Sequence, residues 1–415
     1  MCDFFLKHTK TFTLLLLCVN CSYPVKTIDN EDSGVREIDI IANLSDNQPV
    51  KLSDIASGIE YCMLETDEKC LVVGINSIYC TKDDVVAVGG MSNPAFYVFE
   101  RQSGNFVRQI SKYGQGPGEY TEIINFFWDE LSEQVSVFGH NQYKFYNLDG
   151  TLSHQANKFK HRMFRFVSHE DFYVGYVSNY LGDATARIAF YDKTGDLIDT
   201  IPNYRSWKKE QTWNTTTNDA WLYIFNKNLY FKELYCDTLY QIKDFALHPR
   251  YIFNTGERAV PYEIQEGGRY NTMDIFRNQG VVEDRYENYV CILKILEDNV
   301  HLYFTIEYKK QLYPAIYNKM KDKLQIMPPV TVPPQLLSRN AGQPRSFYGL
   351  ENDLDGGLPF WPQQIISDKE MISVFTAEDL LTLDASKITD VKLKNILNQI
   401  NEDSNPIVAI VTLKE

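Results

Sequence analysis

The sequence predicts an all-β fold, namely a single six-bladed β-propeller with four-stranded blades. Apolar residues alternate with a period of two along most of the chain, and the strand-favouring residues Tyr and Phe number 27 and 24 among 415. Pairs of strands around a polar turn recur, with turn glycines Gly104, Gly150 and Gly195 spaced 46 and 45 residues apart. Four strands in a repeat of about 40 to 50 residues are typical of a propeller blade.

The blades follow one another along the chain, each with an inner strand pair and an outer hairpin. Inner pairs are predicted at 78–90, 125–139, 164–177, 220–234, 289–306 and 365–379. Outer hairpins are predicted at 97–110, 145–152, 189–201, 238–253 and 315–327, and the last two lack the glycine. Two segments, 264–287 and 332–363, interrupt the period, so we expect them to be loops on one face.

The ring of blades needs a closing strand. The C-terminal segment 406–415 reads as a lone strand, and the segments 36–41 and 59–65 precede the first blade. We expect one of these two to pair beside the C-terminal strand, which would cover an edge that could otherwise recruit other chains. The predicted propeller therefore spans residues 36–415, behind a flexible tether at residues 22–35.

Residues 1–21 have the pattern of an export signal. Two lysines precede the apolar run 12–19, which is shorter than the roughly 20 residues that span a bilayer. Cys21 follows as in a bacterial lipobox, although Asn20 stands where that motif usually has a small residue. We expect a lipid anchor at Cys21, and cleavage of an ordinary secreted protein is the alternative. No second apolar segment approaches membrane-spanning length.

Charge and cysteine content exclude several classes of protein. The net charge of -14 argues against non-specific binding of nucleic acid, which needs cationic side chains. Five cysteines remain beyond the signal and tether, and none has CxxC spacing, so neither a zinc nor a redox motif is indicated. The odd number leaves at least one thiol outside any disulfide within the chain.

The segment KYGQGPGEY at 112–120 concentrates backbone freedom. A phosphate-binding loop would need a lysine and a following helix, whereas this segment ends on the acid Glu119, which would repel phosphate. We therefore interpret Gly114, Gly116, Pro117 and Gly118 as a structural corner between the outer strand of one blade and the inner strand of the next.

Three motifs carry a family resemblance. The stretch SGNFVRQISKYGQGPGEY (103–120), the stretch NDLDGGLPFWP (352–362) and the ending NPIV (405–408) resemble signatures of the six-bladed β-propeller lipoproteins of Bacteroides and its relatives. With the signal segment, the resemblance covers nearly the whole chain. It implies one NHL-like propeller on the cell envelope, and it implies no particular chemistry.

Two acids in the second of these motifs are candidate ligand-binding residues. Asp353 and Asp355 alternate before a glycine, as in some calcium loops, but Gln364 stands where an EF-hand would have its bidentate Glu. An Asx-turn, in which the Asp side chains bond their own backbone, is the alternative. We predict neither a metal site nor a cofactor.

Three tryptophans are further candidates for a ligand site. Trp207 and Trp213 lie in a polar stretch between the third and fourth blades, where an indole could contact a sugar. Trp361 stands beside prolines and could serve as a platform for a sugar or peptide, or close the end of the central channel. The histidines lack HxxxH and HExxH spacing, GxSxG is absent, and we predict no catalytic residue.

These observations favour a lipid-anchored monomer on the envelope of a Gram-negative bacterium, facing the periplasm or the surface from the outer membrane. We expect non-catalytic binding of a glycan or an envelope protein at the mouth of the axial channel. The alternative is a propeller enzyme, such as a lactonase, a glycan lyase or a hydrolase. Converging acids or histidines at the axis would favour the enzyme, and backbone groups, Ser, Thr and aromatic residues would favour binding.

Overall fold

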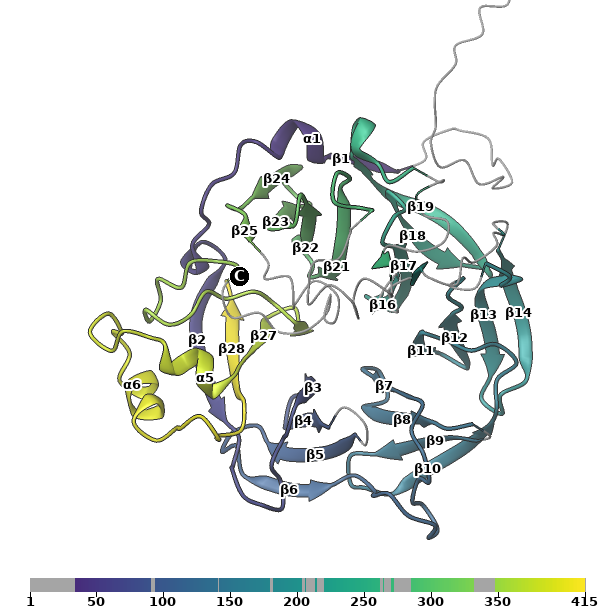
Figure 1. Ribbon diagram of the computed structural model, residues 1–415, viewed down its shortest axis with the longest axis horizontal. Helices are drawn as coiled ribbons and strands as arrows, with labels where there is room; N and C mark the ends of the chain where they lie inside the picture. The colour runs from purple at the N-terminus through teal and green to yellow at the C-terminus, as the bar shows by residue number, and fades with distance from the viewer. Residues whose placement is uncertain are drawn as a thin grey trace, which may run out of the picture.

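The computed structural model describes residues 34–90, 94–140, 142–179, 182–203, 206, 213–214, 220–261, 264, 270–271, 285–331 and 348–414. Six sheets of four or five strands stand around a common axis (Figure 1). The predicted six-bladed propeller is therefore confirmed. Within each blade the strands follow one another in chain order from the axis to the rim, except where the N-terminal strands join the sheet.

The first three blades each consist of four antiparallel strands. Blade 1 contains β3 (Ile75–Cys80), β4 (Asp84–Gly89), β5 (Ala95–Glu100) and β6 (Phe106–Gln109). Blade 2 contains β7 (Asn125–Asp129), β8 (Gln134–Phe138), β9 (Gln142–Asn147) and β10 (Leu152–Asn157). Blade 3 contains β11 (Arg165–His169), β12 (Phe172–Tyr176), β13 (Ala186–Asp192) and β14 (Leu197–Pro202).

Each of the last three blades includes a strand from outside the four-stranded repeat. Blade 4 contains β16 (Ala220–Phe225), β17 (Asn228–Glu233), β18 (Thr238–Lys243), β19 (Ala246–Asn254) and, at its rim, β1 (Arg36–Asp39). Blade 5 contains β21 (Cys291–Glu297), β22 (His301–Tyr308), β23 (Gln311–Asn318), β24 (Lys323–Ile326) and β25 (Val330–Thr331). Blade 6 contains β26 (Gln364–Ser367), β27 (Glu370–Phe375), β28 (Ile407–Leu413) and β2 (Ala56–Met63).

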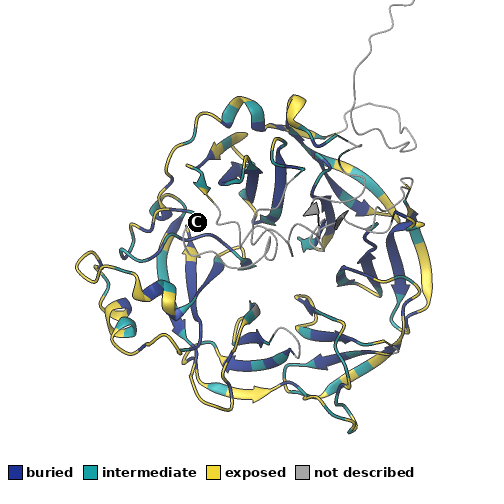
Figure 2. Ribbon diagram, in the orientation of Figure 1, coloured by how far each residue is buried: buried dark blue, intermediate teal, exposed yellow. Residues whose placement is uncertain are grey.

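The core is a set of interfaces between neighbouring blades. Successive side chains of a strand point to opposite faces of its sheet, so each middle strand serves two interfaces. On β4, Val85 and Ala87 pack with blade 6, whereas Val86 and Val88 pack with blade 2. The buried residues accordingly fill the inner strands of the blades, and exposed residues gather toward the rim (Figure 2).

The ring closes through the N-terminal segment. Strand β2 pairs antiparallel with β28, with Glu60 opposite Ile410, which confirms the closing strand predicted at 59–65. The other candidate, 36–41, has a different place: β1 runs parallel to β19 and covers the outer edge of blade 4. The N-terminal segment therefore contacts the rim of blade 4 before it completes blade 6.

The Asn405 side chain stabilises this ring closure through three hydrogen bonds. Its side-chain amide donates to the carbonyls of Glu65 and Cys70 at 2.6 and 3.0 Å, and its oxygen accepts from the Val72 amide at 2.8 Å. The residue is 1% exposed. Asn405 thus ties the segment before β28 to the segment between β2 and β3, which connects blade 6 to blade 1.

The turns of the outer hairpins agree in part with the sequence pattern. Gly104, Gly150 and Gly195 have φ values of 75°, 85° and 99°, which glycine adopts without strain. Where the glycine is missing, Asp244 and Phe245 form the turn between β18 and β19 at φ values of 50° and 55°. The geometry of the turn is therefore kept without its preferred residue.

Short helices are the main departure from the all-β prediction. Residues between β27 and β28 form α5 (Ala377–Leu381), capped by Thr376, and α6 (Val391–Leu397), capped by Asp390. The remaining short elements are α1 (Ile40–Asn43), η1 (Leu52–Asp54), η2 (Gly256–Arg258), β15 (Trp213–Asn214) and β20 (Tyr270–Asn271). None of the helices in the described part of the chain is long and apolar enough to cross a membrane.

Candidate functional site

Four ionisable side chains from four blades meet near the axis, and we call them the axial group: Tyr79, Glu130, Arg165 and Lys294. Tyr79 lies on β3, Glu130 directly after β7, Arg165 at the start of β11 and Lys294 on β21. Glu130 lies within electrostatic range of Lys294 and Tyr79, and Arg165 within range of both as well. Blades 2 and 5 stand on opposite sides of the ring (Figure 1), so such proximity places these side chains at the axis.

Backbone carbonyls hold the two cations of the axial group. The Arg165 guanidinium donates from Nε to the Ala220 carbonyl at 2.9 Å and from Nη1 to the Phe164 carbonyl at 3.0 Å. Lys294 sits where the register of β21 shifts against β22, and its Nζ donates to the Gln363 carbonyl at 2.5 Å. These carbonyl partners help to fix the positions of the two cations.

The acid of the group is open to water yet surrounded by protein. Glu130 is exposed, and desolvation by the surrounding protein nevertheless raises the pKa of its carboxyl to about 7. The surrounding protein weakens the solvation of the carboxylate charge, although the side chain itself is open to solvent. No hydrogen bond or ion pair to another described residue engages the Glu130 carboxylate.

The surrounding protein also shifts the pKa of Lys294. Desolvation lowers the pKa of its ammonium to about 8, against the attraction of Glu130, and Arg165 lowers it further. Burial likewise raises the pKa of the Tyr79 hydroxyl. An acid and a base that titrate close to neutral pH and lie near one another form the kind of cluster that occurs at functional sites.

An aromatic surface adjoins the charged groups. The rings of Tyr79 and Trp128 stack with centroids 5.4 Å apart and an interplanar angle of 16°. Trp128 is buried between blades 1 and 2, whereas Tyr79 is only partly buried at their inner edge. Near the axis, the aromatic ring of Tyr79 therefore lies close to the acid Glu130 and to the two cations of the axial group.

The cations and the acid of the axial group lie toward opposite faces of the propeller. Arg165 begins β11, where the connection from blade 2 arrives, and the Gln363 carbonyl that binds Lys294 immediately precedes β26. Glu130 follows the end of β7, in the turn to β8. The cations thus lie toward the face that carries the connections between blades, and the acid lies toward the opposite face.

Sequence reasoning missed the axial group. Its members fall inside inner strand pairs that the repeat pattern located, but their alternation with apolar neighbours is that of any strand. Nothing in one sequence indicates which polar residue of each blade points to the axis. Acids or histidines at the axis were expected for an enzyme, and backbone groups, Ser, Thr and aromatic residues for a binding protein. The axial group matches neither expectation fully, because it combines one acid with two cations and an aromatic residue.

The two predicted aspartates lie away from the axial group, in the loop before β26. The Asp353 carboxylate accepts hydrogen bonds from the Ser53 amide at 3.0 Å and hydroxyl at 2.6 Å. Asp355 is 3% exposed, and its Oδ1 accepts from the Gly357 amide at 2.8 Å in an Asx-turn. Burial raises the pKa of Asp355, beside the Tyr61 hydroxyl. Both side chains join this loop to the segment that closes the ring.

The tryptophan candidates are dispersed. Trp361 is 8% exposed and packs with Tyr303 and Tyr348, so little of its indole is open to a ligand. The backbone of Trp213 pairs with Asn271, which joins the connection after blade 3 to the connection after blade 4. Trp207 and the proposed lipidation site Cys21 lie outside the described residues.

The glycine-rich segment lies between β6 and β7, and the Glu119 carboxylate folds back onto its backbone. The Gly116 amide donates to Oε2 of Glu119 at 2.8 Å, and Lys112 pairs with Oε1 at 3.3 Å. The Gly116 hydrogen bond, followed by Lys112, lowers the pKa of Glu119. A Cβ at Gly114 would lie 2.0 Å from Oε2, so this residue must be glycine for the carboxylate to fold back. The last glycine, Gly118, has a φ of 80°.

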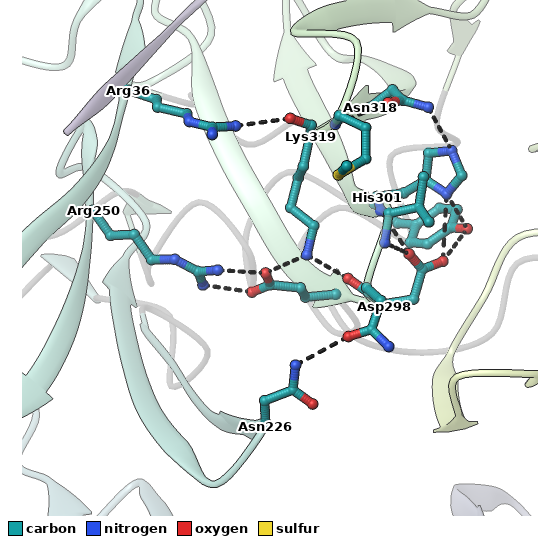
Figure 3. Close-up of polar contacts among 12 residues, drawn as sticks. Arg36, Asn226, Arg250, Asp298, His301, Asn318 and Lys319 are labelled. Carbon is teal, nitrogen blue, oxygen red and sulfur yellow. Dashed lines mark hydrogen bonds and ion pairs between the residues drawn. The ribbon is translucent and has the colours of Figure 1, made fainter. Parts of the chain in front are cut away.

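A second polar cluster lies between blades 4 and 5. Arg250 of blade 4 forms two hydrogen bonds with Glu297, and Lys319 donates to the same carboxylate at 2.7 Å (Figure 3). Arg36 of β1 donates to the Lys319 carbonyl at 2.7 Å. Because two cations engage the Glu297 carboxylate and Arg36 bonds the Lys319 carbonyl, this cluster braces the N-terminal strand and two blades. Across the described ranges, no group of three His, Cys, Asp or Glu side chains could hold a metal ion.

Fold and axial group together define the class as a six-bladed β-propeller with a charged axis. The chain belongs to the family described as a domain of unknown function, DUF4934, whose model matches residues 35–412. No protein with a curated description matches the sequence.

Among solved structures, a protein of Bacteroides fragilis that is provisionally described as exported shares the fold. It is 19% identical, with a TM-score of 0.65 over 92% of this chain and 100% of its own. A member of the DUF4221 family from Bacteroides vulgatus is 12% identical, with a TM-score of 0.48 over 86% of this chain and 97% of its own. At these identities the first similarity supports the fold alone.

Proposed function

We propose that this protein is a non-catalytic binding propeller that takes a glycan at its axis. The observation that carries the proposal is the convergence of Tyr79, Glu130, Arg165 and Lys294 from four blades. Sites for small ligands combine aromatic groups with a few convergent polar groups, and the axial group has both of these elements. The Glu130 carboxylate, which forms no hydrogen bond or ion pair with another described residue, can accept hydrogen bonds from sugar hydroxyls.

A glycan fits the molecule better than a protein partner does. The axial group lies inside the ring of six blades, which favours a narrow ligand such as a chain of sugars over a folded protein. Large exposed apolar side chains are scattered over different parts of the described surface, among them Val73, Leu131, Met320 and Val391. A protein interface would be expected to gather such residues into one patch.

One observation favours an enzyme as the second candidate. The pKa values of about 7 for Glu130 and about 8 for Lys294 suit proton transfer near neutral pH. Such an enzyme would release a fragment of the glycan or open a ring, whereas a binding protein returns its ligand unchanged. Mass spectrometry of glycans recovered after incubation separates the two, because only catalysis alters their mass or length.

The proposal is tested by screening a glycan array and then titrating a hit by calorimetry. We expect the double variant Glu130→Gln/Lys294→Met to lose at least about tenfold in affinity, since each removed charged hydrogen bond contributes more than about 1.4 kcal/mol. The matched control is Glu60→Gln/Lys392→Met, which makes the same changes on an exposed outer pair separated by 4.0 Å.

Equal loss in both variants, or no loss in either, would place the ligand elsewhere, and an array without hits would exclude the glycan. Melting curves of both variants show whether the fold is kept. Lys294→Met loses the hydrogen bond to the Gln363 carbonyl, so a small decrease in melting temperature is expected for the axial variant and none for the exposed control pair.

The lipid anchor belongs to the same proposal. The signal pattern up to Cys21 supports it, and the similar B. fragilis protein is provisionally described as exported. Growth with an alkyne-bearing fatty acid is expected to label the wild-type chain, and Cys21→Ala is expected to abolish the label. An unlabelled wild type would leave ordinary secretion as the better explanation.

A further inference from the structure

Buried polar atoms without partners gather where the loop before β26 meets the closing strand. They are the amide oxygen and nitrogen of Asn352, Oδ2 of Asp355 and the hydroxyl of Tyr61, and none has a hydrogen-bond partner among the described residues. Asn352 and Asp355 are 7% and 3% exposed, and Tyr61 lies on β2. We call these three residues the closure cluster. Buried polar groups are nearly always paired, so this cluster indicates a further partner.

The three side chains converge over Gly357. A Cβ at this position would lie 2.6 Å from the Tyr61 hydroxyl, and 2.9 Å from both Nδ2 of Asn352 and Oδ1 of Asp355. Only glycine therefore lets these groups approach the backbone so closely. Oδ1 of Asp355 already accepts from the Gly357 amide at 2.8 Å, so Oδ2 is the oxygen that can bind something else.

The closure cluster is negatively charged. No ion pair within 4.0 Å engages the Asp355 carboxylate in the described part of the chain. Burial raises the pKa of Asp355, and the charge of Asp390, which caps α6, raises it further. Burial and the charge of Asp355 likewise raise the pKa of the Tyr61 hydroxyl, which therefore stays neutral. A buried carboxylate is normally paired with a cation or coordinates a metal ion.

We propose that the closure cluster binds a calcium ion through Oδ2 of Asp355, Oδ1 of Asn352 and the hydroxyl oxygen of Tyr61. Calcium takes about six to eight oxygen ligands in flexible geometry, and carboxylates, side-chain amides and waters all serve. Magnesium needs near-ideal octahedral geometry, and zinc prefers nitrogen and sulfur. Because no three His, Cys, Asp or Glu side chains of the described residues form a metal cluster, the site would use a single carboxylate and bind weakly.

The ion would stabilise the closure of the ring. It would join Tyr61 of the closing strand to the loop that holds Asn352 and Asp355. This loop also reaches the segment before α6, because the Thr389 amide donates to the Asp355 carbonyl at 2.9 Å. A ligand that binds only the folded chain raises its stability. The inference is independent of the glycan proposed at the axis.

The alternative is that the closure cluster needs no ion. A buried water could bridge its polar atoms, or a proton on Asp355 could allow a hydrogen bond to Asn352 or Tyr61. Calcium would then leave the melting temperature unchanged, and Asp355→Asn would not alter the response to calcium.

The test is a titration of the chelator-treated protein with calcium chloride, measured by calorimetry and by melting curves. We expect saturable binding with a Kd of about 0.1–1 mM, and a melting temperature that rises by about 1–3 °C at about 10 mM calcium. Asp355→Asn should abolish both effects, and Tyr61→Phe should weaken binding by at least about threefold. The matched control is Asp353→Asn, which makes the same change on a carboxylate held by Ser53 and should keep the response.

Magnesium chloride at the same concentration controls for screening of the net charge of -14. Equal effects of magnesium and calcium, equal responses of the wild type and Asp355→Asn, or a wild type that does not respond would each overturn the inference. If Asp355→Asn does not fold, Asn352→Ala replaces it, and an unchanged affinity for calcium in that variant would contradict the site. None of these results bears on glycan binding at the axis.

Discussion

The Arg250 guanidinium and the Glu297 carboxylate join blades 4 and 5 through two parallel hydrogen bonds of 2.7 Å. The Glu297 side chain is 0% exposed, and Lys319 supplies a second cation at 2.7 Å. Arg250 also lies over the Tyr230 ring at 4.2 Å. A buried carboxylate between two cations depends on both of them, because each alone would compensate it incompletely.

Removal of Arg250 should therefore be costly. We expect Arg250→Met to lower the free energy of unfolding by about 3–5 kcal/mol, since it leaves Glu297 buried with Lys319 as its remaining ion-pair partner. Urea denaturation measures the change. Lys310→Met, which breaks the exposed pair with Glu287, is the control and should cost less than about 1 kcal/mol. Similar small losses in both variants would contradict the structural role of the cluster.

Asn405 should be required for ring closure. Asn405→Ala leaves the Val72 amide and the carbonyls of Glu65 and Cys70 without their partner, at a cost of about 1–3 kcal/mol for each group that stays buried. Hydrogen exchange should speed up first in β2 and β28. Asn401→Ala, in the exposed loop just before, should leave exchange in these strands unchanged. Uniform acceleration over all blades would argue against a local role in closure.

The glycine-rich corner should lose its internal anion when a side chain is added. Gly114→Ala places a methyl group where Oε2 of Glu119 lies, so the carboxylate must leave the Gly116 amide. We expect the pKa of Glu119 to rise toward the usual range near 4.3. A carbon-detected NMR titration follows this directly.

The lowered pKa of Glu119 also determines how the free energy of unfolding changes with pH. Because the pKa of Glu119 is lowered in the folded state, its contribution is present above the unfolded pKa and is lost as pH falls through the folded pKa. The wild type should therefore lose stability relative to Gly114→Ala on acidification below about pH 4. An unchanged pKa in the variant would contradict the contact.

The cysteine thiols should be inert in the folded protein. All five cysteines of the described residues are buried and none forms a disulfide. Desolvation raises the pKa of Cys62 to about 11, and that of Cys80 to about 12, so neither forms the reactive thiolate at neutral pH. We expect an aromatic disulfide reagent to leave these thiols unmodified in the native protein, and to react with all five in denaturant. Rapid labelling of the native protein would contradict the burial of these thiols.

Much of the fold was predictable because it repeats. Hairpins around Gly104, Gly150 and Gly195, and the closing strand before the first blade, follow from alternation and turn residues, which are local properties. The helices α5 and α6 were not predicted, since a short polar insertion lacks a long periodic pattern. The place of β1 on blade 4 was also missed, because a four-residue strand can pair with any open edge.

The candidate site, like the fold, was predictable only in part from the sequence. By itself the sequence determined the blades, their order, the corner at Gly114 to Gly118 and the pattern of an export signal, because strand period and turn chemistry act between neighbours in the chain. Only the tertiary structure decided that Tyr79, Glu130, Arg165 and Lys294 share one axis, and that Asp355 and Trp361 are buried. The members of the axial group are separated by up to 215 residues, and the closure of the ring is what brings their charges within range of one another.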